Sequence, residues 1–192
     1  MSIIKGIEKT MREQGLRDET QFDFTESEAD QPGRILAFIR QMDQALSEEQ
    51  RLSIMEEQGC SKDDKTVAPH RAFARKHRRK SIEEKVRLYT KKLKSPHKPN
   101  LQLNSDGTLS AYWGFGDAGK LHCVCGIMGE TSNHEQVPLT FCGCCGGHTR
   151  FLLQCTLGVD LKLVKIVSSA ANSGGAQRCE FLFELIGGPH DH

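Results

Sequence analysis

The chain has 192 residues, and its 26 Lys and Arg nearly balance its 25 Asp and Glu, so the formal net charge is +1. This balance argues against a main role in binding nucleic acid, and no run approaches the roughly 20 apolar residues that span a bilayer. The first residues lack the apolar core and cleavage site of a secretory signal. We therefore expect a cytoplasmic protein with no membrane partner, in which the eight Cys residues are ligands or reactive thiols rather than disulfides.

The first half of the chain has the spacing of apolar residues that is typical of helices. Residues 1–32 include one short helical pattern and an acidic, turn-rich stretch, so we expect a partly ordered N-terminal segment. Residues 33–97 form an expected helical region. Within it, Ser47 and Gln50 fit a capping box, and Pro69 is positioned to open a further helix.

Beyond residue 98 the pattern changes to short alternating runs separated by glycine-containing turns. In chain order we expect strands at 109–115 and 120–125, a helix at 149–157, and strands at 159–168 and 178–186. The expected fold class is therefore α+β. A helical N-terminal half packs on an antiparallel sheet domain, residues 98–188, made of two hairpins joined by a helix.

Five cysteines lie in two tight groups, Cys123-x-Cys125 and the glycine-rich segment that holds Cys142, Cys144 and Cys145. Zinc takes four thiolate or imidazole ligands in a tetrahedron, and two Cys-x-Cys pairs supply four sulfurs if their segments meet. In an extended strand the side chains of residues two apart lie about 6.5 Å from each other, so chelation by one pair needs a local bend. The predicted ligands are Cys123, Cys125, Cys142 and Cys144. Zinc is the expected ion, ahead of an iron–sulfur cluster or copper.

Four other residues are candidates for additional ligands: Cys60, Cys145, His148 and Cys179. Two other interpretations of the cysteines stay open. Cys142, Cys144 or Cys145 is a nucleophile or redox thiol, activated by a helix N-terminus and aided by His148 as a base. Alternatively, the thiols are inert and pack in the core like small apolar residues.

The run of residues 70–80 is strongly basic. A nucleic-acid contact is one interpretation. We favour a solvated helix face, because acidic stretches on both sides balance its charge.

Residues 107–186 resemble a bacterial family through Asp106-Gly107, the two Cys-x-Cys motifs, Gly158-Val159 and Cys179-Glu180-Phe181. The ending is similar to the vinyl-reductase-like small-molecule-binding domain, an α+β ligand-binding fold found in bacterial phenol-type sensors. The paired cysteines look more like a cysteine-rich branch that is labelled as resembling an aminothiazoline carboxylate hydrolase.

The resemblance implies zinc, which the sensors hold with three cysteines and a glutamate. Cys179 matches the last of those cysteines, and an early cysteine of residues 142–145 matches the first. The intermediate Glu-x-x-Cys falls near residues 165–169, where this chain has neither ligand. The sensor-type site therefore does not carry over whole, and Cys123 and Cys125 are the candidates to complete it.

The leading hypothesis is a cytoplasmic zinc-binding protein that binds a small molecule or acts as a sensor. The alternative is a cysteine-dependent hydrolase or thiol-redox enzyme. The ligand's identity and whether the chain forms a homodimer are left open.

Overall fold

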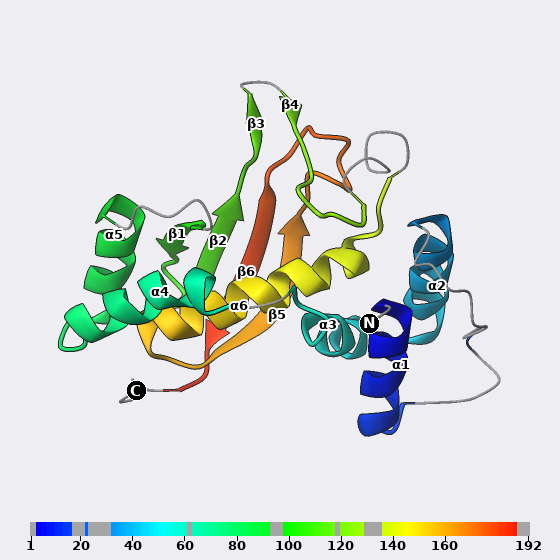
Figure 1. Ribbon diagram of the computed structural model, residues 1–192, viewed down its shortest axis with the longest axis horizontal. Coiled ribbons are helices and arrows are strands. Elements are labelled where there is room, and N and C mark those ends of the chain that lie inside the picture. The colour runs from blue at the N-terminus through cyan, green and yellow to red at the C-terminus, as the bar shows by residue number, and fades with distance from the viewer. Residues whose placement is uncertain are drawn as a thin grey trace.

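The computed structural model describes residues 3–16, 22, 32–60, 63–92, 98–117, 120–128 and 136–187. The fold is α+β, as expected, with helices around a four-stranded antiparallel sheet of order β1-β2-β6-β5 (Figure 1). The elements are α1 (Ile3–Glu13), α2 (Pro32–Ala45), α3 (Glu48–Glu56), α4 (Asp64–Lys76), α5 (Ile82–Lys92), β1 (Asn100–Leu103), β2 (Leu109–Trp113), β3 (Gly116–Asp117), β4 (Lys120–Leu121), η2 (Leu139–Cys142), α6 (Gly143–Leu157), β5 (Leu161–Ser168) and β6 (Cys179–Leu185).

Most of the expected helices are present, but two expected helix starts are wrong. The helix expected at 149–157 is α6, which begins six residues earlier, at Gly143. The capping box before α3 is formed, with Ser47 and Gln50 each bonding to the backbone of the other. The prediction that Pro69 opens a helix is wrong, because α4 begins five residues earlier and contains Pro69. Asp63 caps this helix by accepting a 2.7 Å hydrogen bond from the backbone N–H of Thr66. A strong N-cap therefore overrides the helix-breaking tendency of the proline.

Parts of the expected N-terminal segment and of two expected turns lie outside the described residues, namely 17–21, 23–31, 118–119 and 129–135. The helix expected near the N-terminus is α1, and it buries Ile4, Ile7 and Met11.

The sheet consists of two hairpins, β1–β2 and β5–β6, joined through α6 and a short ribbon. The expected pairing of residues 109–115 with 120–125 is wrong, because the residues that pair with β4 lie just beyond the expected strand. Only Gly116 and Asp117 pair with Leu121 and Lys120, while β2 pairs with β1 and β6. The edge strand β5 has two register shifts against β6, which bend it locally.

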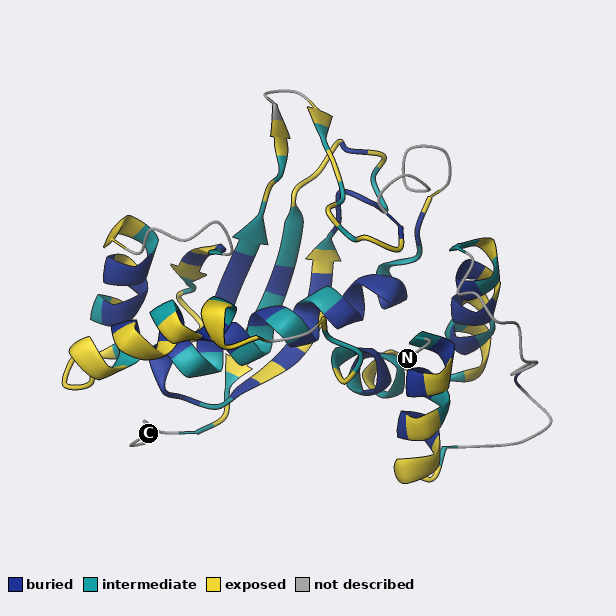
Figure 2. Ribbon diagram, viewed as in Figure 1, coloured by how far each residue is buried: buried dark blue, intermediate teal, exposed yellow. Residues whose placement is uncertain are grey.

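The helices cover one face of the sheet. Helix α6 crosses this face, α4 packs against α6, and α5 lies beside β1 (Figure 1). Along β5, Leu161 and Leu163 are buried, whereas Lys162 and Val164 are exposed on the other face (Figure 2). None of the described helices is long and apolar enough to cross a bilayer.

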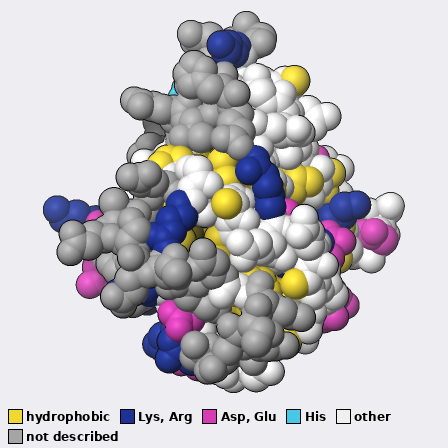
Figure 3. Space-filling view, turned by 90° about the vertical axis from the view of Figure 1, so that its right-hand side faces the viewer, with side chains coloured by type: hydrophobic (Ala, Val, Ile, Leu, Met, Phe, Trp, Pro, Cys, Tyr) yellow, Lys and Arg dark blue, Asp and Glu magenta, His cyan; other side chains and the backbone are white. Residues whose placement is uncertain are grey.

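Two hydrophobic clusters meet at the start of α6. One lies between the sheet and α4, α5 and α6, and includes Phe181 and Phe183. The other joins α1, α2 and α3, and includes Ile7 and Met55. On the side of the molecule where α1 and α2 lie, the described side chains in view include hydrophobic, basic and acidic ones (Figure 3).

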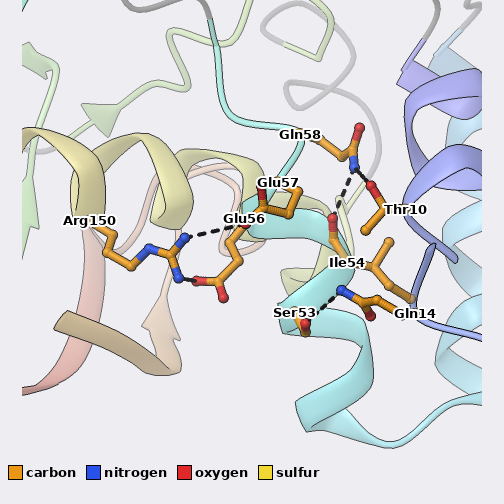
Figure 4. Close-up of polar contacts among 8 residues, drawn as sticks. All are labelled: Thr10, Gln14, Ser53, Ile54, Glu56, Glu57, Gln58 and Arg150. Atoms are coloured by element: carbon orange, nitrogen blue, oxygen red, sulfur yellow. Dashed lines mark hydrogen bonds and ion pairs between the residues drawn. The ribbon is translucent and has the colours of Figure 1, made fainter. Parts of the chain in front are cut away.

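Helix α3 is tied to both clusters by polar contacts near its end (Figure 4). On one side, Gln58 donates a 2.9 Å hydrogen bond to the Thr10 hydroxyl of α1. On the other side, Arg150 of α6 forms ion pairs with Glu56 at 2.8 Å and with Glu57 at 3.4 Å. The Glu56 side chain is 13% exposed and that of Glu57 is 58% exposed, so only the first pair is largely enclosed.

Replacing Arg150 by Met should lower the free energy of unfolding by about 2 kcal/mol at neutral pH, because Glu56 loses its counter-ion in an enclosed site. Burial is the main cause that raises the pKa of Glu56 above its ordinary 4.5. A raised carboxyl pKa means that ionisation costs stability, so the variant should recover stability as the pH falls toward 4.5. Urea denaturation at two pH values measures this. Glu57→Gln is the control and should change stability by less than about 0.5 kcal/mol; an equal loss in both variants would contradict the argument.

Candidate functional site

The glycine-rich start of α6 lets this helix lie unusually close to its neighbours. A Cβ atom on Gly143 would lie 2.6 Å from Cβ of Met55, and one on Gly146 would lie 2.6 Å from Leu163. A Cβ atom on Gly147 would overlap the backbone carbonyl oxygen of Glu56. The cysteines between these glycines are therefore held at the junction of the two hydrophobic clusters.

Each of the three cysteines in this segment has different surroundings. Cys142 belongs to the sheet cluster and Cys144 to the helical cluster, while Cys145 packs against both. The Cys142 sulfur lies 3.1 Å from the hydroxyl of Ser169, in the loop after β5. Ser169 is also hydrogen-bonded to the thiol of Cys179, so the two thiols share one hydroxyl partner.

The Cys123–Cys125 segment reaches α6 because β4 is fixed to the loop after β5. The backbone N–H of Leu121 donates to the Gly175 carbonyl at 3.1 Å, and that of His122 donates to the Phe115 carbonyl at 2.8 Å. Cys123 and Cys125 then pack against the helical cluster. We call the set Cys123, Cys125, Cys142, Cys144, Cys145 and Cys179 the thiol cluster.

A tight turn after Cys125 surrounds its sulfur with hydrogen-bond donors. The backbone N–H groups of Ile127 and Met128 and the thiol of Cys123 all bond to this sulfur. The N–H of Cys125 in turn donates to the Cys123 sulfur at 3.4 Å. The two side chains are therefore in contact, unlike the pair expected in an extended strand.

These donors give Cys123 and Cys125 opposite acidities. The hydrogen bond from Cys123, with help from the backbone donors, lowers the pKa of Cys125 to about 6. The same hydrogen bond, together with burial, raises the pKa of Cys123 well above its ordinary range. Loss of a proton from the pair is therefore favoured at the Cys125 sulfur rather than at the Cys123 sulfur.

Three other thiols of the cluster, those of Cys142, Cys145 and Cys179, favour the protonated form. Burial raises the pKa of Cys142 and of Cys179, and the hydrogen bond with Cys144 followed by burial raises that of Cys145. Charge on Cys125 adds to the increase for Cys142 and Cys145, which shows how close the two segments lie. The nucleophile expected among Cys142, Cys144 and Cys145 therefore has a stronger candidate in Cys125.

No family model, curated protein or solved structure matches this chain. The family resemblance based on the cysteine motifs thus stays a prediction.

The predicted zinc ligands are close together but do not surround one point. Among the described residues, no three His, Cys, Asp or Glu side chains are arranged to hold a metal ion. The thiol of Cys125 is hydrogen-bonded to that of Cys123, while the thiol of Cys142 is hydrogen-bonded to the hydroxyl of Ser169. Four-sulfur coordination by Cys123, Cys125, Cys142 and Cys144 would therefore require side-chain rearrangement.

The remaining candidate ligands lie at the edge of the thiol cluster. Cys60 is exposed and follows Gly59, whose Cβ position lies 3.1 Å from the backbone nitrogen of His148. His148 is half-buried in α6. Sequence reasoning missed Ile127, Met128 and Ser169, because spacing along the chain does not show where backbone N–H groups or a distant hydroxyl point.

Proposed function

We propose that this chain is a thiol-redox protein whose functional centre is the thiol cluster, with Cys125 as the attacking thiolate. The observation that carries the proposal is the convergence of three donors, from Cys123, Ile127 and Met128, on the Cys125 sulfur. Such donors stabilise an anionic sulfur, and the thiolate is the form of cysteine that attacks.

The reaction that this pair supports is thiol–disulfide exchange with a disulfide substrate. The Cys125 thiolate attacks one substrate sulfur, the S–S bond breaks, and half of the substrate leaves as a thiolate. Cys123 then loses its proton to solvent and attacks the Cys125 sulfur, which releases the second half. The two cysteines end as a disulfide, and the substrate has gained two electrons.

The surroundings of the pair favour access by a substrate. Val124 is 57% exposed and Ile127 is 37% exposed, so the segment lies at the surface and offers apolar contacts beside the thiolate. Cys123 and Cys125 are themselves half-buried, which leaves part of each side chain open to solvent. A reducing compartment such as the cytoplasm would keep the pair in its active, reduced form.

Binding of zinc is the second candidate, and the gathering of six cysteines from separate segments favours it. The N–H donors around Cys125 would also stabilise a metal-bound thiolate. In this case Cys123, Cys125, Cys142 and Cys144 are the proposed ligands, and the resemblance to zinc-containing sensors of small molecules adds support. Zinc would then order the junction of the two hydrophobic clusters.

Alkylation by iodoacetamide as a function of pH, with each cysteine followed by mass spectrometry, tests the leading proposal. Cys125 should react with a midpoint near pH 6, following its lowered pKa. A more acidic thiolate is a weaker nucleophile, which offsets most of the gain in ionised fraction, so the midpoint and not the rate is diagnostic. A midpoint above about pH 8 would contradict the proposal.

The same preparation distinguishes the two candidates if no metal-affinity step is used. The redox proposal expects reactive Cys125 in protein without stoichiometric metal, and loss of two thiols when a small disulfide is added. The zinc proposal expects about one bound ion per chain and protection of Cys125 that a chelator removes.

A further inference from the structure

A cavity of about 400 Å³ lies between α2, α3, η2 and β5. Cavities of this size are typical of small-molecule sites. Its wall combines apolar side chains, such as Leu52 and Ile166, with charged groups of both signs. This mixture is what a small polar ligand with an apolar part requires.

One side of the wall contains a charged pair with an unused donor. Arg51 bonds to Asp43 twice, at 3.1 Å to the carboxylate and at 2.9 Å to the backbone carbonyl. The hydroxyl of Thr140 also donates to the Asp43 carboxylate. The Nε–H group of Arg51 is buried and has no acceptor among the described residues. The Nε atom is closed off from solvent, whereas the Arg51 side chain as a whole is 20% exposed, so a ligand in the cavity would meet the exposed part of this cation.

The other two charged groups of the wall are Lys165, on β5, and Glu48, at the start of α3. Within the described part of the chain, neither forms an ion pair with another side chain. The wall therefore has two cations and two anions, with Arg51 and Asp43 already paired to each other. Glu48 and Lys165 are both exposed, so water solvates each of them without a ligand, and a ligand with a positive and a negative group could pair with both at once.

We propose that this cavity binds a compact zwitterion of the free amino-acid type. Its carboxylate would accept hydrogen bonds from Arg51 and Lys165, and its ammonium group would bind to Glu48. Leu52 and Ile166 would contact the ligand's apolar side chain. Binding does not depend on the chemistry proposed for the thiol cluster.

The cavity is nevertheless connected to that cluster through two short segments. Thr140 lies in the same 3-10 helix as Cys142, and Asn172 lies in the loop that carries Ser169. Because Ser169 is the hydrogen-bond partner of Cys142, both segments that hold this cysteine contact the cavity. A bound ligand would therefore restrain the position of Cys142.

Isothermal titration calorimetry with alanine, leucine and phenylalanine as free amino acids tests the proposal, with acetate and methylammonium as single-charge comparators. At least one amino acid should bind, and each comparator should bind about tenfold more weakly or not at all. Absence of binding by all three amino acids, or equal binding of a comparator, would overturn the proposal.

Matched variants locate the site. Lys165→Ala and Glu48→Gln should each weaken binding about tenfold, since each removes one charged partner of the ligand. Lys162→Ala and Glu49→Gln are the controls: these residues lie on the same strand and helix, pair with each other at 3.1 Å, and do not line the cavity. Equal binding by the cavity variants and their controls would overturn the assignment. Unchanged binding by Cys125→Ser would show that the cavity binds its ligand without the thiolate. The ligand-binding proposal and the thiol-redox proposal can therefore be tested separately.

Discussion

Replacing Gly147 by Ala should lower the free energy of unfolding by about 3 kcal/mol or more, because among the described glycines its Cβ position makes the closest approach to a neighbouring atom. The added Cβ would overlap the backbone carbonyl oxygen of Glu56, and backbone cannot move aside as a flexible side chain can. Relief would require α3 and α6 to separate, which would open the junction of the two hydrophobic clusters. Urea denaturation measures the loss.

Gly33→Ala is the control for the general effect of alanine in a helix. Gly33 lies in α2, and a Cβ atom there would meet nothing within 4 Å. Alanine should therefore be neutral or stabilising by up to about 1 kcal/mol at this position. If Gly147→Ala were as stable as Gly33→Ala, the close approach of α3 and α6 would be wrong.

Replacing Cys123 by Ala should raise the pKa of Cys125 by about one unit or more, because the thiol of Cys123 is the main donor that stabilises the Cys125 thiolate. The alkylation midpoint would then move up from about 6 toward the ordinary value of 9.0. This shift corresponds to a tenfold or greater loss of thiolate at low pH. Cys125 would also lose its partner for disulfide formation.

Cys155→Ala provides the matched control, because Cys155 lies further along α6 and outside the thiol cluster. Its replacement should leave the midpoint of Cys125 unchanged. A shift of equal size in both variants would mean that general loosening of α6, rather than the hydrogen bond from Cys123, controls the acidity of Cys125.

Local patterns predicted the helices better than the strand pairings. The capping residue Ser47 and the apolar spacing of α1 and α2 depend on neighbours in sequence, so they could be recognised directly. The partner of β2 could not be recognised from the sequence. Its pairing with β6 joins segments about seventy residues apart, and burial against α6 decides it. The helix start expected at Pro69 was wrong because the N-cap at Asp63, also a local signal, begins the helix earlier.

The candidate site could be predicted only in part, for the same reason. Clustering of cysteines in two short segments indicated a common centre, and the structure brings those segments together. Which thiol is acidic depends on the direction of the N–H groups of Ile127 and Met128, which sequence spacing does not determine. The cavity beside Arg51 was not foreseen, because its walls come from four separate elements.

The irregular course of β5 also bears on how copies of this chain meet. An edge strand exposes a row of unpaired backbone groups, and a straight one readily recruits another strand. Here two register shifts interrupt that row, and the exposed Lys162 and Lys165 add charge along it. Addition of a strand from another copy to the sheet at β5 is therefore disfavoured.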